Sequence, residues 1–154
     1  MRGWLVGAER VLSEDIPAAP ETVRDFYVDL ENMRLVHPLV VSVRSVARVD
    51  TADGYEQTYR VQDRIPFGRL TLPTSYSARL YVPVSGDVVA EARQFPMVRL
   101  HTVVTFDGVD GGTRLTERMR IQAPRILAAV TVREAVKAHT AMLAGVRHYF
   151  GQRR

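Results

Sequence analysis

Two ionisable residues, Glu117 and His139, fall at positions that the sequence pattern predicts to be buried. Glu117 lies between Leu115 and Met119 in an alternating run, and residues two apart share one face of a strand. A buried carboxylate is costly unless it is paired or protonated. Glu117 is therefore predicted to orient a polar ligand group or to act as a general acid or base. The alternatives are a structural partner of a buried tyrosine or arginine, and a position near the strand end that reaches solvent.

His139 belongs to the apolar stripe of a helix predicted over residues 124–150. Residues that recur at steps of three and four share one face of a helix. A histidine on such a face either donates to a ligand, pairs with Glu117 as an acid–base couple, or is a hydrogen-bonded core residue. The stripe consists of Ala129, Val132, Val136, His139, Leu143, Val146 and Phe150.

The elements that would position these two side chains follow from the same periodicities. Turn sequences such as Asp53-Gly54 and Asp110-Gly111-Gly112 join consecutive strands, which indicates hairpins and an antiparallel sheet. We predict a single α+β domain over residues 1–154, with a curved sheet of about seven strands (β-α-α-β6-α) wrapped around a long C-terminal helix. Strands are predicted near 7–16, 40–49, 55–65, 70–81, 87–95, 98–106 and 113–122, and shorter helices from Pro20 and over 30–35.

The inner face of this sheet carries polar side chains among aliphatic ones, and a core without a cavity has less use for them. Tyrosine suits a hydrophobic ligand with one or two oxygens, although ordinary core tyrosines and an exposed Asp63 beside the turn at 66–68 are the alternatives. The sequence therefore predicts a ligand cavity between sheet and helix. Its predicted lining is Gln57, Tyr59, Asp63, Thr74, Tyr76, Thr102, Phe106, Glu117, Met119, Ala135, His139 and Met142.

Composition narrows the classes of site and partner. The 154 residues include no cysteine, which excludes disulfides, thiolate metal sites and cysteine nucleophiles, and is compatible with a cytoplasmic protein. The four histidines lack metal-ligand spacing, so no metal and no other cofactor is predicted. The net charge is +4, but the arginines are dispersed apart from Arg153-Arg154, and no nucleic-acid motif accompanies them.

Hydropathy argues against a membrane protein. The apolar run at the N-terminus is too short for a signal peptide, and no stretch is long enough to span a bilayer. The predicted partner is a hydrophobic small molecule, without nucleic acid or integral membrane contact, and the protein is expected to be a monomer or a homodimer.

Two segments carry a resemblance to a known superfamily. The first, residues 16–26, reads Ile-Pro-Ala-Ala-Pro-Glu-Thr-Val-Arg-Asp-Phe and is similar to the strand followed by I-x-A-x-x-E-x-V-W/F of START-like (SRPBCC) proteins. The second, Asp29 to Val41, resembles their D…W-x-P-x-V stretch, with Val36 and His37 where an aromatic residue is common. This superfamily includes birch-pollen-allergen relatives, bacterial polyketide cyclase/dehydratase-like proteins and lipid-transfer domains.

The resemblance implies a helix-grip fold and leaves the function open, because one scaffold hosts several functions. The first hypothesis is binding of a lipid, polyketide or aromatic compound, for transport or sequestration. The second is a polyketide aromatase/cyclase-type enzyme that uses Glu117 and His139 as acid–base groups. The third is a protein-interaction module that docks through the outer face of the sheet. The sequence also leaves open whether His37 or the first strand contributes to the cavity mouth.

Overall fold

The computed structural model describes residues 3–153. Met1 and Arg2 lie outside the described residues, as does Arg154, the second residue of the Arg153-Arg154 pair. The strands are β1 (Leu5–Ile16), β2 (Val40–Asp50), β3 (Gly54–Phe67), β4 (Leu70–Pro83), β5 (Val88–Gln94), β6 (Val98–Val109) and β7 (Gly112–Pro124). The helices are α1 (Pro20–Val28), the single 3-10 turn η1 (Leu30–Asn32), α2 (Met33–Val36) and α3 (Arg125–Gly151).

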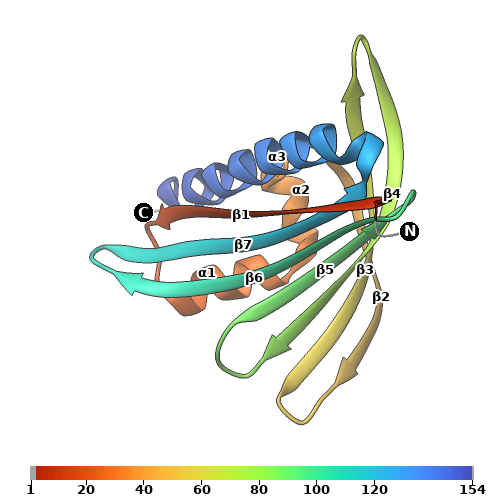
Figure 1. Ribbon diagram of the computed structural model, residues 1–154. Coiled ribbons are helices and arrows are strands. Elements are labelled where there is room, and N and C mark those ends of the chain that lie inside the picture. The colour runs from red at the N-terminus through yellow and green to blue at the C-terminus, as the bar shows by residue number, and fades with distance from the viewer. Residues whose placement is uncertain (1–2, 154) are drawn as a thin grey trace.

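The seven strands form one antiparallel sheet in the order β1-β7-β6-β5-β4-β3-β2. Figure 1 shows this sheet curving, with α3 lying along β1 and the β3–β4 hairpin rising beside the N-terminal end of α3. The predicted curved sheet and long C-terminal helix are therefore confirmed.

The short helical segment between α1 and β2 has clear local causes. The Asp29 side chain accepts a hydrogen bond from the backbone N–H of Glu31 at 3.1 Å, which caps η1. His37 is extended, with φ −89° and ψ 123°, because the residue before a proline disfavours the helical region. The chain thus leaves α2 at His37 and turns into β2.

Register assigns the faces of β1, which the sequence left unassigned. Leu12 lies opposite Glu117 and Glu14 opposite Leu115, so these β1 residues share the inner face of the sheet. Glu14 also accepts a hydrogen bond from Arg147 of α3 at 2.9 Å. This ion pair links the last helix to the first strand.

The two halves of α3 are buried to different extents. Its C-terminal half supplies Leu143, Val146 and Phe150 to the core, and the Phe150 ring packs edge-on against Phe26 of α1 at 5.3 Å. The half from Arg125 to Lys137 contains no buried residue, and Ala129 of the predicted stripe is exposed. The predicted stripe therefore packs into the core only from Ala138 onward, because the other half covers a cavity.

Candidate functional site

A cavity of about 360 Å³ lies between the inner face of the sheet and α3. This volume is at the lower end of the range, roughly 300–1,000 Å³, that is typical of small-molecule sites. Most of the cavity wall is apolar, as such sites are. Its main apolar side chains are Met33, Val61, Ile65, Ala78, Leu80, Leu100, Ile121, Ala135, Ala138 and Met142.

Exposed side chains in the cavity wall locate the cavity mouth. Phe95, between β5 and β6, and Val130, on the N-terminal half of α3, both line the cavity. They are 93% and 41% exposed, whereas Thr102 and Met142 in the same wall are each 2% exposed. The cavity therefore opens between the β5–β6 turn and the first half of α3, and its inner end lies near Thr102 and Met142.

The carboxylate of Glu117 links two helices, α1 and α3, through hydrogen bonds. Its side chain on β7 is fully buried, and its two carboxylate oxygens accept separate hydrogen bonds. The Tyr27 hydroxyl of α1 donates to Oε2, and Nδ1 of His139 on α3 lies 2.9 Å from Oε1. Glu117 therefore does not itself line the cavity, while Tyr27 and His139 do.

The surroundings of Glu117 and His139 favour an ion pair between a charged carboxylate and a charged imidazole. Burial raises the pKa of Glu117, but the charge and hydrogen bond of His139 and the Tyr27 hydroxyl outweigh burial, so the pKa is lowered overall. Burial alone would lower the pKa of His139. The charge and hydrogen bond of the Glu117 carboxylate outweigh burial, so the pKa of His139 is raised overall. With Nδ1 held by Glu117, Nε2 is the ring nitrogen of His139 that remains for a molecule in the cavity.

His37 is a second histidine in the cavity wall, in a different protonation state. Its ring meets that of His139 edge-on at 5.7 Å between centroids. Burial and the neighbouring His139 lower its pKa to about 4. Its Nδ1 accepts the backbone N–H of Leu39 at 3.2 Å, which requires that nitrogen to be unprotonated. The site therefore combines one neutral and one charged imidazole.

Asp63 lies on β3 in the cavity wall and is only 7% exposed. Burial raises its pKa to about 6, against the opposing effect of His139. Its Oδ1 is buried without a hydrogen-bond partner. Tyr76 of β4 lines the same wall, and burial together with the charge of Asp63 raises its pKa. Asp63 is thus not the exposed turn residue that was the alternative reading of the sequence.

Half of the predicted lining residues border the cavity. They come from three strands and one helix, and burial or partial burial is common to all of them. These residues are Asp63, Tyr76, Thr102, Ala135, His139 and Met142.

The other predicted lining residues do not border it: Gln57, Tyr59, Thr74, Phe106, Glu117 and Met119. Gln57 donates to Ser45 at 2.9 Å, and the Tyr59 hydroxyl donates to the Val28 carbonyl at 3.4 Å. Phe106 packs edge-on against Tyr27 at 5.7 Å. The correction has one main physical reason: the inner face is longer than the cavity, and α1 covers part of its other end.

Sequence reasoning missed Tyr27 as a site residue and left His37 undecided. Tyr27 sits among the apolar positions of α1 and reads as ordinary core. The available signal was indirect, because a buried Glu117 requires donors and a tyrosine was one of the partners considered.

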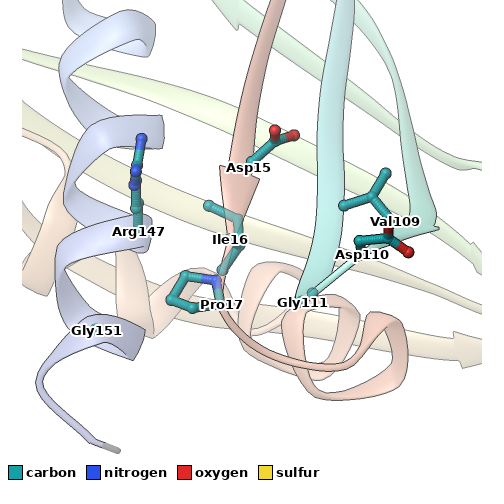
Figure 2. Close-up of a pocket in the computed structure, with 9 residues that line it drawn as sticks. Asp15, Ile16, Pro17, Val109, Asp110, Gly111, Arg147 and Gly151 are labelled. Carbon is teal, nitrogen blue, oxygen red and sulfur yellow. The ribbon is translucent and has the colours of Figure 1, made fainter.

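A second recess, of about 330 Å³, lies at the other end of the molecule (Figure 2). The end of β1, the β6–β7 turn and the C-terminal end of α3 form its walls. Two of its charged side chains are already paired, Asp15 with Arg114 and Arg147 with Glu14, both at 2.9 Å. Within residues 3–153, none of the buried unpaired polar atoms lies in this recess. The cavity beside α3 is therefore the candidate site.

Residues 3–153 lack two kinds of feature. In residues 3–153, no group of three or more His, Cys, Asp or Glu side chains is placed to hold a metal ion. Across the same residues, no helix combines the length and the hydropathy needed to cross a bilayer.

Comparisons with known proteins identify the fold. No protein-family model matches the chain, and no curated protein matches its sequence significantly. Solved structures do match over nearly the whole chain. The di-domain ARO/CYC StfQ from the steffimycin biosynthetic pathway is 14% identical with a TM-score of 0.73, covering 99% of this chain and 53% of that one.

Two further structures match over most of both chains. The ZhuI aromatase/cyclase from Streptomyces sp. R1128 is 14% identical with a TM-score of 0.65, covering 97% of this chain and 95% of that one. A STAR-related lipid transfer protein fragment from Xanthomonas axonopodis is 18% identical with a TM-score of 0.60, covering 92% and 85%. The chain has the helix-grip fold that its sequence resemblance to START-like proteins implied.

Proposed function

We propose that this helix-grip protein binds a hydrophobic small molecule in the cavity between its sheet and α3. The observation that carries the proposal is an apolar cavity of about 360 Å³ whose wall includes His139, held by the buried Glu117. Apolar walls supply the binding free energy, and a few fixed polar groups orient the ligand. The similar structures include one named as a lipid transfer protein, which supports binding as the function. The proposed setting is the cytoplasm, with which the cysteine-free composition is compatible.

The neutral dye N-phenyl-1-naphthylamine tests this proposal, because its fluorescence rises in apolar surroundings. We expect the dye to bind the native protein and to be excluded by Ala135→Trp, which places an indole in the cavity wall. Ala129→Trp on the exposed side of the same helix is the matched control and should bind the dye normally. Absence of dye binding, or equal binding by a folded Ala135→Trp protein, would contradict a ligand site here. Native mass spectrometry of the purified protein then asks which small molecule it retains.

A second candidate function is polyketide aromatase/cyclase-type catalysis. The favouring observation is that Glu117 and His139 approach within 2.9 Å, the contact distance that proton transfer requires. The neutral form of His139 would remove a proton from a carbon next to a carbonyl, so that this carbon attacks a second carbonyl, and the imidazolium would return the proton to the alkoxide that forms. The same imidazole would then remove the second proton of that carbon and deliver it to the new hydroxyl, which leaves as water. Glu117 would act through His139 by stabilising its charged form.

Glu117→Gln separates the two functions, because it keeps the shape of the side chain and removes its charge. With a reactive poly-β-ketone thioester as substrate, an enzyme should lose about 10²-fold or more in turnover while it still binds. A pure binder should show no turnover in either protein and an affinity change of about 1–3 kcal/mol, the usual cost of altering one buried polar contact. Substrate turnover by the native protein that Glu117→Gln does not reduce would refute the acid–base role.

A further inference from the structure

One buried polar atom in the cavity wall has no hydrogen-bond partner in the fold. Asp63 is 7% exposed, and its Oδ1 is buried without a hydrogen bond. Buried polar atoms are nearly always paired, so such an exception in a cavity wall calls for an explanation. Asp63 does not belong to the Glu117–His139 pair, with which it shares no hydrogen bond among the described residues.

The residue opposite Asp63 has the same deficiency. Thr74 of β4 lies directly opposite Asp63 of β3, and directly opposed residues lie on the same face of the sheet. The Thr74 Oγ1 is also buried without a partner. Two neighbouring polar groups are therefore unpaired: the Asp63 carboxylate in the cavity wall, which accepts when ionised, and the Thr74 hydroxyl, which does not border the cavity.

We propose that Asp63 anchors a hydroxyl group of the ligand, so that the cavity selects hydroxylated apolar molecules, such as phenols or aliphatic alcohols, over their methylated counterparts. A ligand hydroxyl has one donor, and the Asp63 carboxylate in the cavity wall accepts it. One ligand hydroxyl thus supplies the hydrogen bond that this carboxylate lacks in the fold. A ligand ammonium would be repelled by the charged His139 of the same wall, whose charge acts on Asp63, so a neutral hydroxyl fits better. The inference rests on the proposed function and names the class of its ligand.

A matched pair of ligands tests the selection directly. The pair is 2-naphthol and 2-methoxynaphthalene, which share the ring system and the oxygen but differ in the donor. Dissociation constants come from displacement of N-phenyl-1-naphthylamine at pH 8, where the raised pKa of Asp63, about 6, leaves it ionised. We expect the native protein to bind 2-naphthol about tenfold more tightly, the scale of one hydrogen bond to a charged group.

Two variants locate the preference at Asp63. Asp63→Leu should bind both ligands equally and should bind the dye at least as tightly as the native protein, because the wall becomes more apolar. Asp63→Asn keeps a neutral acceptor and should reduce the preference to about threefold, the scale of a neutral hydrogen bond. It also provides the readout if Asp63→Leu fails to fold. Asp25→Leu makes the same change at an exposed position of α1 and should keep the full preference.

Each other outcome is decisive. Equal binding of the two ligands by the native protein, or a preference that survives both Asp63 variants, overturns this inference while dye binding still upholds the proposed function. Tighter binding of 2-(aminomethyl)naphthalene than of 2-naphthol would show that Asp63 selects cations and would overturn the hydroxyl assignment. Failure of the native protein to bind the dye overturns the proposed function and this inference with it.

Discussion

Replacement of Glu117 by Gln should destabilise the protein most strongly between about pH 4.5 and 6.5. The carboxylate has a lowered pKa, so its contribution is present above its ordinary pKa of 4.5 and is lost as the pH falls through the lowered value. His139 has a raised pKa, so its contribution is present below 6.5 and is lost as the pH rises through the raised value. Both contributions are complete only in the window between the two ordinary values.

The magnitude follows from the bonds that Glu117 makes. Its carboxylate accepts from the Tyr27 hydroxyl and from His139, and hydrogen bonds to charged groups are worth about 1.5–3 kcal/mol each. The Gln amide retains an acceptor for Tyr27 and can pair with a neutral imidazole, so the loss is limited to one charged contact and the imidazolium it stabilised. We expect the free energy of unfolding to fall by about 2–4 kcal/mol at pH 5.5, and by less at pH 9.

Urea unfolding of the native protein and of Glu117→Gln at pH 5.5, 7 and 9 measures this difference. Glu31→Gln, at an exposed position in η1, controls for a general effect of losing one negative charge. His37 does not complicate the range, because its pKa of about 4 keeps it neutral throughout. A destabilisation that is constant from pH 5.5 to 9, or that grows with pH, would show that Glu117 and His139 are not an ion pair.

Three shorter predictions test the surrounding structure. In a histidine NMR titration, His37 should remain neutral down to pH 5, whereas His139 should titrate above 6.5 in the native protein and at lower pH in Glu117→Gln. Leu143→Ala should cost about 2–5 kcal/mol in urea unfolding, as other buried leucines do, while Ile126→Ala, 92% exposed on the same helix, should cost almost nothing. Arg147→Ala breaks a half-exposed ion pair and should cost about 0–1 kcal/mol by the same measurement, so a loss above 2 kcal/mol would contradict that view of the contact.

Periodicity predicted the faces of the elements well, because each face depends only on local backbone geometry. The alternation around Glu117 and the helical spacing around His139 placed both residues on inner faces. Their contact at 2.9 Å depends on how α3 lies over β7, which no local pattern determines. The same limit hid Tyr27, whose hydroxyl reaches Glu117 from α1 across 90 residues of sequence.

The extent of the cavity was overestimated for a related reason. Alternation identifies a whole inner face, but it does not tell which part a helix covers. Tyr59 and Phe106 share that face, but α1 packs against them and covers them, so they do not border the cavity. Asp63 shares it too and borders the cavity, because the helices leave its part of the sheet uncovered. A pattern based on residue type alone could not separate these cases.

The two halves of α3 explain where the polar groups of the site must lie. From Ala138 onward the helix contributes buried residues to the core, and its cavity-lining face runs from Val130 at the opening to Met142 at the inner end. His139 lies three residues before Met142, so its charge is at the inner end of the cavity rather than at the mouth. Asp63 is also buried behind the exposed rim. A ligand that uses either group must therefore enter with its polar end first and leave its apolar part toward the opening. That orientation requires the ligand to shed water from its polar group on entry, and a charged pair and an unpaired carboxylate at the inner end offset this loss.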